Sequence, residues 1–220
     1  MITLFIRDIR LAVRRAGDIL SYVGFFLMIA TLFPLAIGPD EATLSLVTSS
    51  VLWIAVLLAA IPSFDRLYYD DYHFGFFDQL ILRRTSLFDY AIMRVVSHFL
   101  VMGVPLLLSL PIMGLFFAIE ASKLILIAGM IAIGLFALTC LGSIGASLTL
   151  GARRSGLLSA VLILPLAFPI LIFGTLASQA VLDDTAYGAH LALLGSAALF
   201  LSVISPIATL FSLRIALEEQ

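Results

Sequence analysis

Six long apolar runs dominate this chain and restrict the folds that it can adopt. They lie near residues 19–37, 44–62, 92–118, 123–150, 157–178 and 189–213. A helix needs about 20 apolar residues to cross about 30 Å of hydrocarbon. The chain is 62% apolar and 12% charged, against about 45–50% and about 25% in soluble domains, so a soluble core could not hide its apolar surface. We therefore predict an all-α membrane protein with six transmembrane helices, forming a single domain over residues 1–220.

Basic residues predict the orientation of these spans, because lysine and arginine accumulate in cytoplasmic loops. One side of the membrane would hold eleven of the twelve basic residues: Arg7, Arg10, Arg14, Arg15, Arg66, Arg83, Arg84, Arg94, Arg153, Arg154 and Arg214. The other side would hold only Lys123, together with Asp40, Glu41, Glu120, Asp183 and Asp184. We predict that both termini and the segment 63–90 are cytoplasmic. The run at 19–37 exceeds the length of a signal-peptide core, so we expect a true span.

The first 17 residues show the periodicity of an amphipathic helix. Apolar residues recur at intervals of three or four, and arginines lie on the opposite face at Arg7, Arg10 and Arg14. This pattern predicts a helix that lies in the lipid headgroup layer. The alternative is a short basic tail that only sets the orientation of the first span.

The segment 63–90 is the longest polar interruption between the apolar runs. It carries five of the fourteen acidic residues, namely Asp65, Asp70, Asp71, Asp78 and Asp89, and it is rich in aromatic residues. A membrane protein that works with a water-soluble partner must offer that partner a water-facing surface, and this segment is the one sizeable candidate. The alternative is a solvated loop between two spans.

Several catalytic motifs are absent. The single lysine, Lys123, follows Ala121-Ser122, so no Walker A motif, Gly-x-x-x-x-Gly-Lys-Ser/Thr, exists in the chain. Neither a His-Glu-x-x-His zinc motif nor a Gly-x-Ser-x-Gly nucleophile elbow occurs. We therefore expect no catalytic residue and no metal site in this chain. Cys140 is the only cysteine, which excludes an internal disulfide.

Small residues in the fourth run predict close helix packing. They are Gly142, Ser143, Gly145, Ala146 and Ser147. The face that they form packs either within the bundle or between two copies of the chain, and the sequence leaves both open.

Four groups of residues, in this order and at these spacings, resemble the haem exporter protein B family. The first is Leu-Phe-Pro-Leu-Ala-Ile-Gly-Pro at 32–39. The second is Asp65-Arg66-Leu67 followed by Asp70-Asp71, Gly75 and Asp78-Gln79-Leu80. The third is Leu-Thr-Leu-Gly-Ala-Arg-Arg-Ser-Gly at 148–156, and the fourth is Pro165-Leu166 with Pro169 and Leu171-Ile172-Phe173. The chain departs from the family pattern where Arg83-Arg84-Thr85-Ser86 replaces a proline-containing turn, and where Asp65 replaces glutamate.

The resemblance implies the permease subunit of an ABC-type complex for cytochrome c maturation in the bacterial inner membrane. Its implied partners are a cytoplasmic ATPase, a haem-handling membrane protein, a periplasmic haem chaperone, the lipid bilayer and a second copy of the chain, but no nucleic acid. Haem would be a substrate, ATP would bind through the partner, and this chain alone would bind no cofactor. The complex would either export haem or release haem-loaded chaperone. The alternative function is an ABC-2 type permease for an unrelated lipid or drug.

The resemblance also implies site residues. A coupling helix between the second and third spans would sit in a groove of the ATPase, with Phe74, Phe77, Leu80 and Ile81 as anchors. The residues expected to bind the ATPase are Asp65, Arg66, Asp70, Asp71, Phe74, Gly75, Phe77, Asp78, Gln79 and Leu80. Arg153 and Arg154 would form a second cytoplasmic loop. His98 would be either a packing histidine near the membrane surface or a residue of the haem pathway.

Overall fold

The computed structural model describes residues 2–38, 40–82, 85–150 and 155–218, and within these ranges it contains helices and no strands. Six helical segments are long and apolar enough to cross a membrane. The helices that form most of these segments are α2 (Ala16–Ile37), α3 (Glu41–Phe64), the continuous run of α6 (Leu87–His98), η1 (Phe99–Gly103) and α7 (Val104–Phe116), then α8 (Ala121–Leu148), α9 (Ser155–Leu182) and α10 (Gly188–Glu218). This confirms the predicted all-helical class with six candidate spans.

The third candidate span begins at Leu87, five residues before the predicted boundary, and therefore includes polar residues. Ser86 caps α6, because its Oγ accepts a hydrogen bond from the backbone N–H of Asp89 at 3.4 Å. A serine cap satisfies one of the free N–H groups at a helix start. Arg94, near the start of the predicted span, consequently lies about two turns inside the helix.

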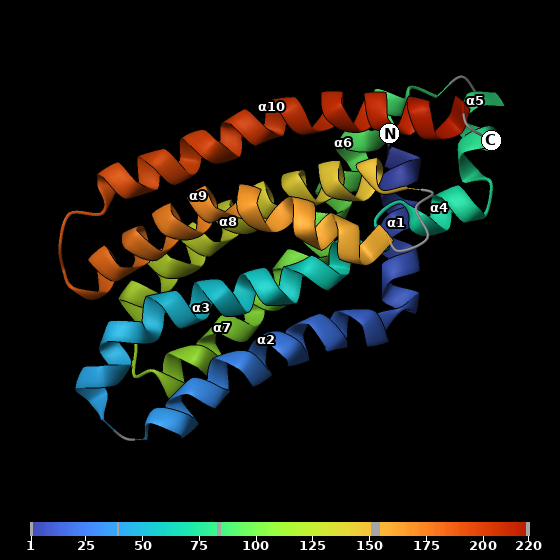
Figure 1. The fold of residues 1–220 in the computed structure, drawn as a ribbon. Helices are drawn as coiled ribbons and strands as arrows, with labels where there is room; N and C mark the ends of the chain where they lie inside the picture. Colours follow the sequence, from blue (N-terminus) through green and yellow to red (C-terminus); the bar gives the residue numbers. More distant parts are fainter. Residues whose placement is uncertain (1, 39, 83–84, 151–154, 219–220) are drawn as a thin grey trace.

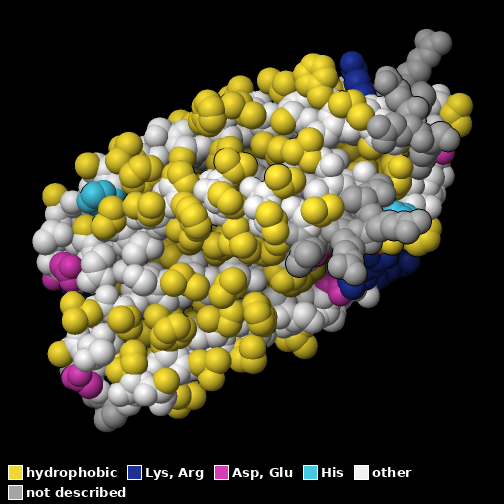
Figure 2. Space-filling view, viewed as in Figure 1, with side chains coloured by type: hydrophobic (Ala, Val, Ile, Leu, Met, Phe, Trp, Pro, Cys, Tyr) yellow, Lys and Arg dark blue, Asp and Glu magenta, His cyan; other side chains and the backbone are white. Residues whose placement is uncertain are grey.

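The six candidate spans run side by side, and α1 (Ile2–Arg14) crosses one end of their bundle (Figure 1). The short helices α4 (Tyr69–His73) and α5 (Phe76–Leu82) lie at the same end, as do both ends of the described chain (Figure 1). The turns that join α2 to α3, α7 to α8 and α9 to α10 lie at the opposite end. The sides of the bundle are largely apolar (Figure 2), with residues such as Leu115 85% exposed, as expected of a surface that meets lipid.

Small residues let α8 pack closely against its neighbours within the chain. A Cβ atom added at Gly142 would lie 2.3 Å from the Phe64 ring, and one at Gly134 or Gly174 would lie 2.4 Å from the Trp53 ring. Glycine therefore leaves the space that each aromatic ring occupies. The predicted small-residue face thus packs inside the bundle, which is the first of the two arrangements that the sequence left open.

Candidate functional site

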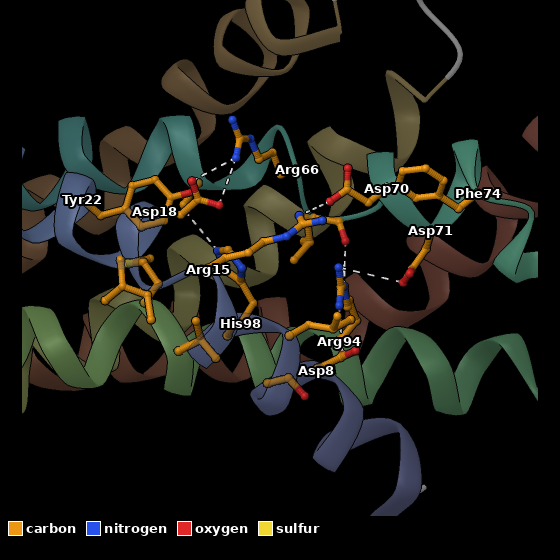
Figure 3. Close-up of a pocket in the computed structure, with 18 residues that line it drawn as sticks. Asp8, Arg15, Asp18, Tyr22, Arg66, Asp70, Asp71, Phe74, Arg94 and His98 are labelled. Atoms are coloured by element: carbon orange, nitrogen blue, oxygen red, sulfur yellow. Dashed lines mark hydrogen bonds and ion pairs between the residues drawn. The ribbon is translucent and has the colours of Figure 1, made fainter.

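A pocket of about 230 Å³ lies at the end of the bundle that α1 crosses. Side chains from α1, α2, α4, α6 and the turn after α3 converge on it (Figure 3). The charged residues among its lining are Asp8, Arg15, Asp18, Arg66, Asp70, Asp71 and Arg94. Because these are three arginines and four aspartates, the pocket combines both signs of charge and does not form a single basic or acidic patch.

Two buried carboxylates connect three helices beside this pocket. Asp71 on α4 accepts hydrogen bonds from Arg7 on α1 at 2.9 Å and from the Tyr90 hydroxyl on α6 at 2.5 Å. Asp8 on α1 pairs with Arg94 on α6 at 3.0 Å and with the adjacent Arg7 at 2.7 Å. Asp8 and Asp71 are only 6% and 8% exposed. We call these five residues the inner network.

The inner network balances its own charge, with two arginines against two carboxylates. Arg94 also donates from Nε to the carbonyl of Leu67 at 2.7 Å, and the Arg7 guanidinium lies 3.7 Å above the centre of the Phe76 ring on α5. Burial lowers the pKa of Arg7, but the Asp71 and Asp8 carboxylates outweigh this and leave that pKa raised. A buried charge that loses its partner is strongly unfavourable, so the network holds α1, α4, α5 and α6 together.

Two further ion pairs lie at the rim of the pocket and are exposed. Arg15 pairs with Asp70, and the Arg66 guanidinium pairs with Asp18 at 2.9 Å. Each pair bridges the α1–α2 region to the α3–α4 region (Figure 3). Exposed ion pairs of this kind contribute about 0–1 kcal/mol, so the rim is held far less firmly than the inner network.

The inner wall of the pocket comes from the end of α6. His98 Nε2 lies 3.0 Å from the Ser63 Oγ, and His98 is partly buried. The neighbouring Ser97 is 2% exposed, and its Oγ has no hydrogen-bond partner among the described residues. The backbone then changes from α-helix to the π-helix η1 directly after His98.

The predicted ATPase-binding residues do not share one surface. Gly75, at φ +66°, separates α4 from α5, so the segment is two short helices and not one. Phe74 is 77% exposed, and Asp78 and Gln79 are exposed as well. Phe77 and Leu80 are buried, so they pack inside this chain and are not free to contact a partner.

The remaining predicted residues fall in different places. Phe77 and Leu80 belong to a hydrophobic cluster with Tyr68, Tyr90 and Leu213. Asp65 accepts a hydrogen bond from Ser159 on α9 at 2.8 Å. Arg66 and Asp70 are in the rim pairs, and Asp71 is in the inner network. Arg153 and Arg154 lie outside the described residues, as Arg83 and Arg84 do.

Sequence reasoning missed most of the inner network. It placed Arg7 on the water-facing side of α1, whereas the structure has Arg7 partly buried against Asp71 and Phe76. The signal that could have found the network is Arg94, an arginine that lies within a long apolar stretch and therefore needs a buried partner.

Comparison with known proteins identifies the family. The CcmB protein family matches residues 1–216. The chain belongs to this family. A protein named heme exporter protein B from Haemophilus influenzae is 38% identical over 213 residues, which cover 97% of this chain and 96% of the relative. Proteins of the same name from Bradyrhizobium diazoefficiens and Escherichia coli K12 are 40% and 34% identical, with 96% and 98% of each chain covered.

In this CcmB-family chain, the matched region includes every residue of the pocket and of the inner network. The likeness to these relatives extends over almost the whole of both sequences and is not confined to the apolar runs. The charged end of the bundle is therefore part of the region that matches the family. Its charged and polar side chains are the candidate functional residues.

Proposed function

We propose that this chain is the permease subunit of an ABC-type complex for cytochrome c maturation in the bacterial inner membrane. Relatives of nearly equal length are named heme exporter protein B. Haem is the substrate of the complex, and a separate cytoplasmic subunit hydrolyses ATP, since the sequence holds no Walker A motif. The chain itself is not an enzyme. A haem-handling membrane protein and a periplasmic haem chaperone complete the complex.

The ATPase binds the end of the bundle formed by α1, α4 and α5. Phe74 supports this placement because it is a large apolar side chain that is 77% exposed at the polar end of the bundle. Asp78 and Gln79, exposed on the adjoining helix, supply polar contacts. Interfaces of this kind depend on a few aromatic anchors surrounded by polar groups.

The inner network is the observation that carries the coupling mechanism. Through Asp71 and Tyr90 it joins α4, next to the proposed ATPase surface, directly to α6. The helix continues without a break from α6 through η1 into α7, along the third candidate span. A displacement of α4 by the ATPase therefore moves the third span instead of only bending a loop. The same movement would serve haem export or the release of haem-loaded chaperone.

Two measurements in a bacterial host test this function. Deletion of the gene is expected to abolish holocytochrome c, and c-type cytochromes that persist unchanged would exclude the proposed pathway. Phe74→Ala is expected to reduce co-purification of the ATPase by about tenfold or more, since loss of an anchoring aromatic side chain costs about 2 kcal/mol or more.

Phe88→Ala is the matched control for the second measurement. Phe88 is the same residue type, is 37% exposed, and lies on α6 outside the α4–α5 segment. This variant is expected to retain the ATPase. Full recovery of the ATPase with Phe74→Ala would show that the partner binds elsewhere.

A further inference from the structure

One buried hydroxyl group lies in the wall of the pocket. Ser97, on α6, lines the pocket and is 2% exposed, and its Oγ has no hydrogen-bond partner in the parts of the chain that the structure describes. A buried hydroxyl without a partner is unfavourable. The Ser97 hydroxyl is therefore available to a hydrogen-bond acceptor that enters the pocket from outside the chain.

The lining of the pocket changes in character with depth. The helix α2 and the run of α6 and η1 both lead into the bundle from the end that α1 crosses (Figure 1). Along α6 and η1 the lining residues are first charged, then polar and then apolar: Arg94, Ser97, His98, Val101 and Met102. Along the start of α2 apolar residues likewise follow charged ones: Arg15, Asp18, Ile19 and Tyr22. A phospholipid has the same order along its length, with a charged headgroup, ester groups and acyl chains.

The charges at the rim balance one another, and this balance restricts the kind of headgroup that fits. Four residues form the two rim pairs: Arg15 with Asp70, and Arg66 with Asp18. An anionic headgroup would meet two carboxylates there, and a cationic one would meet two guanidinium groups. Sites for anionic lipids are basic pockets instead. The rim therefore fits a headgroup that carries one charge of each sign.

The acidic residues at the rim favour a primary ammonium as the cation of that headgroup. A primary ammonium offers N–H donors to carboxylates, and Asp18 and Asp70 are acceptors at the rim. A quaternary ammonium has no N–H group and is typically held within a cage of aromatic rings. Tyr22 and Phe74 line the pocket but lie on opposite sides of the rim residues, so they do not form such a cage (Figure 3).

We propose that this pocket is a headgroup site for phosphatidylethanolamine, a phospholipid whose headgroup carries a phosphate and a primary ammonium. The phosphate pairs with Arg15 and Arg66, and the ammonium pairs with Asp18 and Asp70. Ser97 Oγ donates a hydrogen bond to an ester carbonyl of the same lipid. Each charged residue of the rim thereby exchanges its present partner for a group of the same sign on the lipid, and each keeps an opposite charge beside it.

The size of the pocket suits a headgroup and not a larger ligand. Its volume of about 230 Å³ is below the roughly 300–1,000 Å³ of sites that enclose drug-sized molecules. Only the headgroup and the ester groups enter the pocket, because the acyl chains stay in the bilayer. They leave past Ile19 and Val101, which are partly exposed. The two rim pairs open on entry, and as exposed ion pairs they are individually weak.

The first test compares three lipids on the unaltered chain. The purified full-length chain in detergent is titrated with phosphatidylethanolamine, phosphatidylcholine or phosphatidylglycerol of the same acyl chains, and bound lipid is measured by native mass spectrometry. Phosphatidylethanolamine is expected to bind about tenfold more tightly than the others, because only its headgroup forms charge-assisted hydrogen bonds with both the arginines and the aspartates. Equal affinity for the three lipids, or a preference for either of the others, would overturn the site.

A soluble competitor distinguishes a lipid from a free compound with the same headgroup. Glycerophosphoethanolamine carries this headgroup without acyl chains. At a concentration equal to that of the lipid, it is expected to leave bound phosphatidylethanolamine in place, because it lacks the chains that hold the lipid in the apolar phase. Displacement at that concentration would assign the pocket to a soluble ligand and would refute a lipid site.

Paired variants test the rim without a change in net charge. Arg66→Gln combined with Asp18→Asn is expected to weaken binding of phosphatidylethanolamine about tenfold, because one charged contact is lost from each end of the headgroup. Lys123→Gln combined with Asp184→Asn is the matched control, since it removes an ion pair at the opposite end of the bundle. The control is expected to bind the lipid as the unaltered chain does. Equal affinities in the two double variants would overturn the site, and thermal unfolding in detergent verifies that both are folded.

Ser97→Ala tests the contact with the ester group. This variant is expected to bind phosphatidylethanolamine about threefold to tenfold more weakly, because a buried hydrogen bond is lost. Diether phosphatidylethanolamine has no ester carbonyl, so the unaltered chain and Ser97→Ala are expected to bind it equally. A loss on Ser97→Ala that is the same for both lipids would refute the placement of the ester beside Ser97. None of these measurements involves haem, the ATPase or holocytochrome c, so the lipid site and the proposed function are tested independently.

Discussion

Asp70 and Asp71 are adjacent in the sequence, but the structure gives them different environments. Asp70 pairs with Arg15 at the rim, whereas Asp71 is 8% exposed and is held by Arg7 and by the Tyr90 hydroxyl. Removal of one partner from a buried ion pair leaves an uncompensated charge. At the rim, water replaces a lost partner at little cost. The same substitution at the two positions is therefore expected to have very different effects.

Asp71→Asn is expected to lower the free energy of unfolding by about 3–5 kcal/mol, because Arg7 and Arg94 then share a single carboxylate. Asp70→Asn is the control and is expected to change this free energy by no more than about 1 kcal/mol. Denaturant unfolding of the purified variants in detergent measures both values. Equal effects at the two positions would mean that the inner network does not stabilise this end of the bundle.

At the scale of the element, α8 shows how glycine sets the distance between helices. Gly134 lies against the Trp53 ring, whose Nε1 donates to Ser178 on α9 at 2.9 Å. The indole thus lies between α8 and α9 and is oriented by one hydrogen bond. Gly129 is on the same helix, is exposed, and has no atom within 4 Å of an added Cβ. The two glycines differ in their surroundings and not in their secondary structure.

Gly134→Ala is expected to lower the free energy of unfolding by about 1–3 kcal/mol, because the added methyl group forces the Trp53 ring or the helix to move. Gly129→Ala is expected to leave stability within about 0.5 kcal/mol, since nothing lies in its way. Thermal unfolding of both variants in detergent, monitored by tryptophan fluorescence, measures the difference. A neutral Gly134→Ala would mean that the α3–α8 contact is looser than in the structure.

At the scale of the whole molecule, basic residues gather at one end of the bundle. Arginines of α1, of the α3–α4 turn and of α6 lie among aspartates at the end where α1 crosses, whereas the charged side chains that Figure 2 shows at the opposite end are acidic. Lys123, at that opposite end, pairs with Asp184 at 2.6 Å. Because lysine and arginine accumulate on the cytoplasmic side, this separation predicts that the α1 end faces the cytoplasm.

Cysteine labelling checks this orientation in a Cys140→Ser background. Gln79→Cys, on α5, is expected to react with a membrane-impermeant maleimide only after the cells are permeabilised. Ala186→Cys, in the exposed turn between α9 and α10, is expected to react in intact spheroplasts. The reverse pattern would place the pocket on the periplasmic side and would remove the proposed ATPase surface from the reach of the ATPase.

The sequence by itself determined the number and type of the long helices, because the length and apolarity of a span are local properties. It likewise indicated a helix over the first residues, now α1, through its periodicity, while the position of α1 in the headgroup layer stays a prediction. The small residues of α8 predicted that this helix packs closely against other helices. The sequence also located the segment between the second and third spans that carries the acidic residues of α4 and α5.

Only the tertiary structure decided which of those polar and aromatic residues are inside. Asp71 is buried because Arg7 and Arg94, distant in sequence, reach it from α1 and α6, and Phe77 is buried because Tyr90 and Leu213 cover it. The positive φ of Gly75 broke the expected helical spacing. The pocket at His98 likewise needs Ser63 and Tyr22 from other helices. Burial of a charge depends on partners that no local pattern specifies.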